Sequence, residues 1–232
     1  MENIFIAEVL QDSGMLSIPQ GINLFYLLSQ ILLQDLPGEL VELGCCHGNT
    51  AIMLQKTLDL YNSDKKLHVF DSFEGLPQKH AKDEGTTLKT GGCGSNLGIL
   101  ERRFKKFGAK MPRVHVGWFK DTAHELPDQI CFVHLDFDFY EGTKIALEAI
   151  YPKLVPGAVV IVDDYCDLDF SQRVKKLYET NYFVANVEEK LKTNPNNCPG
   201  VKIACEEFFR DKPEQVSSLL SGYAQHGYFK KQ

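Results

Sequence analysis

Residues 39–50 read ELVELGCCHGNT, a short run of strand-forming residues followed by a glycine-containing turn and the start of a helix. The apolar residues predict a strand over Glu39–Leu43 that ends at Gly44. The apolar spacing that follows predicts a helix over Thr50–Leu60. A strand, a tight turn and a helix in this order form half of a βαβ unit, so this stretch indicates an α/β fold with parallel strands.

The alternation of strands and helices continues along the chain. Further strands are predicted over Leu67–Phe70, Val114–Val116, Ile130–Leu135, Ala158–Val162 and Gly227–Lys230. Further helices are predicted over 22–34, Leu100–Phe107, Thr143–Leu154 and Val201–Phe209, and 168–197 is expected to be helical in part. The polar, glycine-rich segment 78–98 is too long for an ordinary α/β connection, which predicts a mobile surface loop. No linker divides the chain, so we expect one doubly wound domain over 1–232 with a helical N-terminal segment at 1–37.

Composition excludes several classes of protein. The chain has 232 residues, and 25 basic against 31 acidic side chains give a net charge of −6, which argues against nucleic acid as a partner. The apolar runs are shorter than the roughly eighteen residues that cross a membrane. The seven cysteines show no C-x-x-C spacing, and the first residues are acidic where a signal peptide is basic. These features predict a cytoplasmic protein with reduced cysteines.

The first turn has the pattern E-x-G-x-x-x-G, formed by Glu42, Gly44 and Gly48. Ligands of open α/β sheets bind beyond the carboxyl ends of the strands, and glycine lets the backbone come close to such a ligand. No lysine follows Gly48, so this is not a phosphate loop. The acidic residue suits an amino-bearing ligand. An ordinary tight turn between a strand and a helix would show the same spacing.

Two later strand ends carry candidate binding residues. Asp71 follows the second strand, where a carboxylate can accept both hydroxyls of a ribose or can cap the next turn. Trp118 and Phe119 follow the third strand, where an aromatic pair can form a wall against adenine or fill the core.

The strongest chemical signal is a set of carboxylates at two further strand ends. Asp136 closes one predicted strand, and Asp163 and Asp164 close another. Neighbouring strands lie about 5 Å apart, so these groups can converge. Three hard oxygen donors suit Mg²⁺, Mn²⁺ or Ca²⁺ rather than zinc, although helix capping or solvation would also explain them. Asp138 is a weaker candidate because it can cap the next helix, and His134 is predicted to be a core histidine.

The chain resembles the macrocin O-methyltransferase family, a metal-dependent branch of the class I S-adenosylmethionine (SAM) methyltransferases. The matching motifs are VELGC with Gly48, DSFEGLP at 71–77, GWFKDT at 117–122, LDFDFYE at 135–141 and VDDY at 162–165. The resemblance implies a Rossmann-like doubly wound sheet of about seven strands, mostly parallel with an antiparallel edge strand. It also implies SAM as methyl donor and Mg²⁺ or Mn²⁺ as the metal.

The resemblance also assigns roles to residues. It implies that Asp136, Asp163 and Asp164 bind the metal and that Asp136 is the general base. The residues expected to bind the cofactor are Glu42, Gly44, Cys45, Gly48, Thr50, Asp71, Ser72, Phe73, Trp118 and Phe119. The implied reaction is methylation of a hydroxyl on a small molecule, either a sugar or another acceptor with adjacent oxygens. The sequence leaves open whether the protein forms a homo-oligomer. The alternatives are a metal-dependent hydrolase or phosphoryl-transfer enzyme, and a non-catalytic nucleoside-binding module.

One segment departs from the family pattern. About thirty residues, 167–197, follow the VDDY motif where the family runs almost directly into a helix. We expect this insertion and the 78–98 segment to form a lid over the acceptor.

Overall fold

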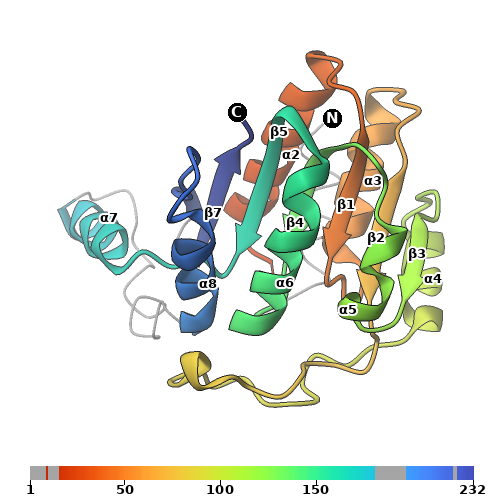
Figure 1. Cartoon of the computed structure of the whole chain (residues 1–232). Coiled ribbons are helices and arrows are strands. Elements are labelled where there is room, and N and C mark those ends of the chain that lie inside the picture. Colours follow the sequence, from red (N-terminus) through yellow and green to blue (C-terminus); the bar gives the residue numbers. More distant parts are fainter. Residues whose placement is uncertain (1–8, 10–15, 181–196, 222–223) are drawn as a thin grey trace.

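The computed structural model describes residue 9 and residues 16–180, 197–221 and 224–232. Its centre is a seven-stranded sheet with the order β3-β2-β1-β4-β5-β7-β6 (Figure 1). The strands are β1 (Glu39–Leu43), β2 (Leu67–Asp71), β3 (Arg113–Val116), β4 (Ile130–Leu135), β5 (Leu154–Asp163), β6 (Ser217–Ser221) and β7 (Ala224–Lys230). β7 runs antiparallel to both of its neighbours, and the pairs among β1 to β5 are parallel. The predicted Rossmann-like sheet is confirmed.

Helices cover both faces of this sheet (Figure 1). The described helices are α2 (Ile18–Leu33), α3 (Asn49–Leu60), α4 (Leu97–Lys106), α5 (Phe119–Thr122), α6 (Tyr140–Ile150), α7 (Leu168–Thr180), which projects away from the sheet, and α8 (Pro199–Phe209), with 3₁₀ turns η1 (Ala81–Asp83), η2 (Ala123–Glu125) and η3 (Tyr151–Lys153). α2 and α3 pack together on one face, and α6 and α8 pack together on the other. Every residue of β4 is buried, as expected for a central parallel strand covered on both faces.

Several boundaries differ from the predicted ones. The predicted helix Thr143–Leu154 is wrong at its end, because α6 stops at Ile150 and Leu154 begins β5. Pro152 lies between them, and a proline cannot continue the backbone hydrogen bonding of a helix. β6 was not predicted, because its sequence SSLLS lacks the alternation of β-branched and aromatic residues that marks a strand. The partly helical character of 168–197 is confirmed for α7, and 181–196 lie outside the described residues.

The segment between β2 and α4 is more structured than a plain surface loop. Within it, η1 carries Asp83, which is buried and accepts hydrogen bonds from the backbone N–H of Tyr140 at 2.8 Å and of His80 at 2.9 Å. Lys82 donates to Glu207 on α8 at 2.6 Å. These contacts fasten the segment, yellow in Figure 1, to α6 and α8 beneath the carboxyl ends of the strands. Its mobility stays a prediction.

The N-terminal segment is described only in part. α2 begins after a capping box in which Ser17 and Gln20 exchange hydrogen bonds, and Val9 is buried in the core. The remainder of 1–15 lies outside the described residues. Among the helices that are described, none combines the length and the hydropathy needed to span a lipid bilayer.

Candidate functional site

The glycine turn after β1 packs directly against the carboxyl end of β4. Gly44 has a φ of 83°, and a Cβ built there would lie 2.0 Å from the carbonyl oxygen of Asp136. The N–H of Asp136 donates to the carbonyl of Leu43 at 2.8 Å. Gly48 has a φ of 82°, and a Cβ there would meet the side chain of Leu100 on α4. Both positions therefore require glycine, and the predicted cofactor turn lies beside the predicted metal residues.

Asp71 at the end of β2 is held by backbone N–H groups. Its Oδ2 accepts from Cys45 and Cys46 at 2.8 Å each, and its Oδ1 accepts from Phe73 at 2.7 Å. The carboxylate thus links the end of β2 to the glycine turn of β1. Oδ1 keeps a lone pair for another donor, so contact with a ribose hydroxyl stays a prediction.

The other predicted cofactor residues surround this turn in different ways. Phe119 is buried in the core, with its ring centroid 5.5 Å from that of Phe70 and 5.4 Å from that of Phe137. Trp118 is half-buried and precedes α5, so it is the member of the aromatic pair with more exposed surface. The Ser72 hydroxyl accepts from the Glu74 N–H at 3.1 Å. Cys45 is buried, and Thr50 is half-buried in the first turn of α3. Their contacts with a cofactor stay predictions.

Four aspartates gather where β4 and β5 end. Asp136 and Asp138 follow β4, Asp163 is the last residue of β5, and Asp164 comes next. Asp138 and Asp164 both have a φ of 57°, a left-handed conformation that costs energy for a residue with a side chain. Cys198 donates from its thiol to Asp164 Oδ2 at 3.2 Å. From the sequence, Asp138 was a weaker candidate than Asp136, and the structure places it in the acidic cluster.

The aspartates of this cluster lie close enough for their negative charges to act on one another. Burial, and then the negative charges of Asp163, Asp138 and Asp164, raise the pKa of Asp136 well above its usual value. Burial and the charge of Asp164 do the same for the pKa of Asp138. Burial and the charge of Asp163 raise the pKa of Asp164 to about 6. Within the described part of the chain, no lysine or arginine forms an ion pair with Asp136, Asp138 or Asp164.

This donor set fits a hard divalent cation. The cluster offers carboxylate oxygens and the Cys198 thiol, and in the described part of the chain no lysine or arginine pairs with Asp136, Asp138 or Asp164. Mg²⁺ and Mn²⁺ prefer such oxygens. Ligand atoms of Asp138, Asp164 and Cys198 lie within 4.8 Å of one another, whereas those of the predicted set Asp136, Asp163 and Asp164 do not. The role of that set as metal ligands stays a prediction.

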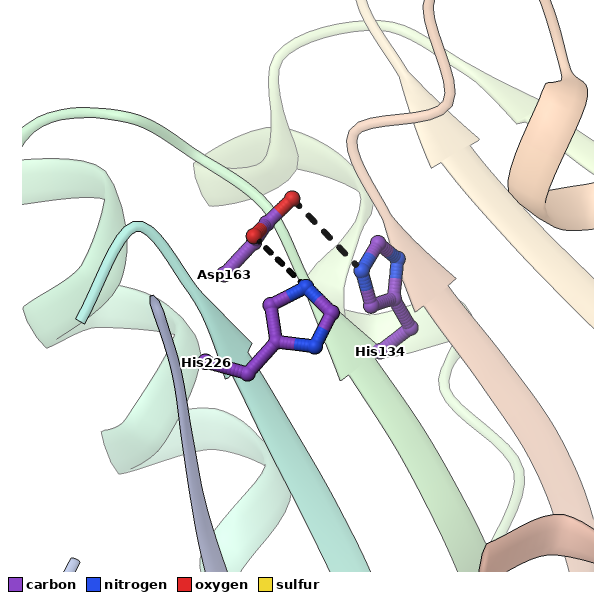
Figure 2. Close-up of side chains that lie close together, drawn as sticks. All are labelled: His134, Asp163 and His226. Atoms are coloured by element: carbon purple, nitrogen blue, oxygen red, sulfur yellow. Dashed lines mark ion pairs between the residues drawn. The ribbon is translucent and has the colours of Figure 1, made fainter. Parts of the chain in front are cut away.

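A row of buried polar side chains extends from Glu42 at the glycine turn to Asp163. Glu42 is fully buried, and its Oε1 lies 3.3 Å from Nδ1 of His134 on the neighbouring strand. His134 Nε2 lies 3.9 Å from Asp163 Oδ2, and His226 Nε2 lies 2.9 Å from Asp163 Oδ1 (Figure 2). Burial raises the pKa of Glu42. Burial would also raise the pKa of Asp163, but the charge and hydrogen bond of His226 lower it to about 2.

This row bears on the expectations for two residues, His134 and Glu42, and adds a third residue, His226. His134 is a core histidine, as predicted. Glu42 lies against His134 rather than open to solvent, and its contact with a ligand amino group stays a prediction. His226 was missed, because one histidine in the last strand carries no spacing signal. All seven cysteines are free, as predicted.

A sequence model of the macrocin O-methyltransferase (TylF) family matches residues 21–193, more than half of the chain. The chain belongs to this family. The match includes the glycine turn, Asp71 and the acidic cluster, and it extends through most of the 167–197 segment.

Two named O-methyltransferases are similar to this chain in sequence. The chain is 35% identical over 153 residues to 8-demethyl-8-(2,3-dimethoxy-alpha-L-rhamnosyl)-tetracenomycin-C 4'-O-methyltransferase of Streptomyces olivaceus, covering 62% of this chain and 59% of that protein. It is 30% identical over 161 residues to mycinamicin III 3''-O-methyltransferase of Micromonospora griseorubida, covering 62% and 61%. The aligned region thus spans about three-fifths of the length of these relatives.

Solved structures share the fold. The O-methyltransferase NovP superimposes with a TM-score of 0.72 at 23% identity, covering 93% of this chain and 80% of NovP. The O-methyltransferase TomG from Streptomyces achromogenes, solved in complex with SAM, superimposes with a TM-score of 0.59 at 16% identity, covering 100% and 89%.

Proposed function

We propose that this protein is a SAM-dependent and divalent-metal-dependent O-methyltransferase that acts on a hydroxyl of a small molecule. The observation that carries the proposal is the contact between the glycine turn of β1 and the acidic end of β4, through Gly44 and Asp136. In a member of the macrocin O-methyltransferase family, this contact would bring the methyl donor and the metal to one edge of the sheet. The relatives named above are O-methyltransferases of natural products, and one of these names includes a rhamnosyl sugar.

The proposed cofactor half consists of the ends of β1 and β2. Gly44 and Gly48 let the backbone approach the methionyl part of SAM. Asp71 fixes the turn through its three backbone hydrogen bonds, and the remaining lone pair of Oδ1 can accept a ribose hydroxyl. Trp118 offers a partly exposed ring for the adenine.

The proposed acidic half consists of the ends of β4 and β5. Asp136, Asp163 and Asp164 would hold the cation, as in the family pattern. When bound, a divalent cation lowers the pKa of an acceptor hydroxyl and orients it. Asp136 would accept the proton that leaves this hydroxyl, and its half-buried position beside the glycine turn would keep it close to the methyl donor.

The proposed acceptor side is bounded by two segments that contact each other. The N–H and the hydroxyl of Thr87 both donate to Oδ1 of Asn197, at 3.1 and 2.8 Å. Lys202 on α8 pairs with Asp167 at 3.1 Å. The Thr87 bonds tie 78–98 to the end of the 167–197 segment, and the Lys202 pair ties the start of that segment to α8, which supports a shared role as a lid over the acceptor.

The two alternative functions have less support. A phosphoryl-transfer enzyme would need cationic side chains near the acidic cluster to bind phosphate. Lysine and arginine form no ion pair with its unneutralised aspartates in the described ranges. A non-catalytic binding module has no use for four clustered carboxylates. The seven free cysteines fit the proposal that the protein works in the reducing cytoplasm.

The test is a methyl-transfer assay with radiolabelled SAM, a panel of glycosides and catechols, and either Mg²⁺, Mn²⁺ or EDTA. We expect transfer to at least one acceptor that carries adjacent oxygens, with loss of activity in EDTA and recovery on adding Mg²⁺. Calorimetry with SAM and S-adenosylhomocysteine is the control for the cofactor site. Binding of both without transfer to any acceptor would favour the binding module.

A further inference from the structure

His226 of β7 is a fully buried histidine that contacts the proposed metal site. It lies directly opposite Asp163 in the antiparallel register of β5 and β7. Its Nε2 lies 2.9 Å from Asp163 Oδ1 (Figure 2), and its Nδ1 has no hydrogen-bond partner among the described residues. With a proton on Nε2, the ring donates a hydrogen bond to the Asp163 carboxylate.

Gln20 of α2 contacts the same oxygen of Asp163. Its Oε1 accepts from the Ser17 N–H at 2.8 Å in the capping box, which fixes the orientation of the amide. Its Nε2 therefore points at Asp163, where it donates to Oδ1 at 3.3 Å. Nε2 also lies 3.1 Å from His226 Nε2, as expected when both nitrogens converge on one acceptor.

The two oxygens of Asp163 consequently have different surroundings. Oδ1 faces three donors, namely His226, Gln20 and the backbone N–H of Asp164 at 3.0 Å. These donors use the hydrogen-bonding capacity of that oxygen, which has two lone pairs. Oδ2 has His134 Nε2 at 3.9 Å, which is too far for a hydrogen bond. The carboxylate is thus held through one oxygen and leaves the other available.

We propose that His226 and Gln20 are positioning residues that hold Asp163 so that Oδ2 can bind the divalent cation. This inference rests on the proposed function, because it assumes that a cation binds at the acidic cluster. Hydrogen-bonding partners of a metal ligand typically contribute about 10–100-fold in metal affinity. The β7 strand and the first turn of α2 would therefore contribute to a site whose ligands come from β4 and β5.

Direct metal binding by the two histidines is the competing arrangement. A ligand atom from each of His134, Asp163 and His226 lies within 4.8 Å of the others. We favour the positioning role because His226 Nε2 already donates to Oδ1 and the Gln20 amide lies beside it. The two arrangements differ in whether nitrogen coordinates the metal.

The experiment uses Mn²⁺ as the probe, with free Mn²⁺ counted by electron paramagnetic resonance. We expect His226→Leu to weaken Mn²⁺ binding about 10–100-fold, because Leu cannot donate to Oδ1. His226→Gln should stay within about threefold of the wild type, because its amide nitrogen can replace the donor. The matched control is Phe229→Leu, a buried change in the same strand, with Mn²⁺ affinity expected within about twofold of the wild type because Phe229 offers no donor. Pulsed measurements should detect no nitrogen coupling to bound Mn²⁺.

The outcomes separate this inference from the proposed function. Unchanged Mn²⁺ affinity in His226→Leu, or nitrogen coupling that disappears in this variant, overturns the positioning role. Wild-type protein that binds no Mn²⁺, or binding that survives Asp163→Asn, overturns the metal-dependent function as well. Should His226→Leu fail to fold, Gln20→Met removes the second donor instead. We then expect a loss of about 3–10-fold in Mn²⁺ affinity, and unchanged affinity counts against the inference.

Discussion

Asp71 at the end of β2 and Asp136 at the end of β4 occupy equivalent places in the sheet but have opposite environments. Three backbone N–H groups satisfy the carboxylate of Asp71. Burial, and then the charges of the neighbouring carboxylates, raise the pKa of Asp136. The backbone of the chain stabilises the charge of Asp71 at the end of β2. The charge of Asp136 at the end of β4 is left for a bound ligand to stabilise. Whether an aspartate at a strand end is structural or binds a ligand therefore depends on which hydrogen-bond donors contact its carboxylate.

The largest expected effect comes from neutralising the acidic end. Asp136→Asn should lower turnover by about 10²–10⁴-fold, because the proposed base and one metal ligand are lost together. SAM affinity should stay within a few-fold, because the cofactor half keeps Asp71 and both glycines. Steady-state kinetics and calorimetry measure the two quantities. Loss of SAM binding in this variant would contradict the separation of the two halves.

The corresponding change at the β2 end should act on stability instead. Asp71→Asn replaces one acceptor oxygen by an amide that cannot accept, which leaves at least one N–H of Cys45, Cys46 or Phe73 without its partner. We expect a loss of about 1–3 kcal/mol in the free energy of unfolding, measured with urea. SAM affinity should fall too, whereas Mn²⁺ affinity should not. Ser72→Ala is a neighbouring control for the unfolding measurement alone, because the Ser72 hydroxyl accepts a local hydrogen bond from the Glu74 N–H.

The comparison also predicts a dependence on pH. The pKa of Asp164 is raised to about 6, so between the ordinary aspartate pKa and 6 the unfolded chain releases a proton that the folded protein retains. Without metal, this group lowers stability as the pH rises through that range. The melting temperature of Asp164→Asn minus that of the wild type should therefore increase by roughly 5 °C when the pH is raised from 4 to 7 in EDTA. A difference that does not change with pH would mean that Asp164 is ionised throughout.

The smallest effect is expected at the proposed lid. Asn197→Ala removes the acceptor of both Thr87 bonds, which are exposed and worth little to stability. We expect KM for the acceptor to rise about two- to fivefold while KM for SAM is unchanged, a shift of about 1 kcal/mol or less. Thr86→Ala is the control, because the Thr86 hydroxyl accepts a local bond from the Leu88 N–H. Equal kinetic constants in all three proteins would place 78–98 outside the acceptor site.

Local sequence signals were sufficient for much of the fold. β1 and β4 have their predicted bounds, because each is a short apolar run with a turn signal after it. The start of β5 and the whole of β6 were not predictable in this way. Leu154 continues an apolar helical pattern until Pro152 is considered, and β6 becomes a strand by pairing with β7. Pairing is a property of two segments, and the sequence of one of them does not encode it.

The sequence alone determined which chemistry the strand ends can carry. The residue type at each strand end and the order of the strands along the chain can both be read from the sequence. It identified the glycine turn, Asp71 and the aspartates after β4 and β5. Only the tertiary structure decided which of these charges are already stabilised. Asp71 is stabilised by backbone amides and Asp163 by His226, which is 63 positions further along the chain. Such donors arrive through packing and strand register, and no spacing in the sequence records them.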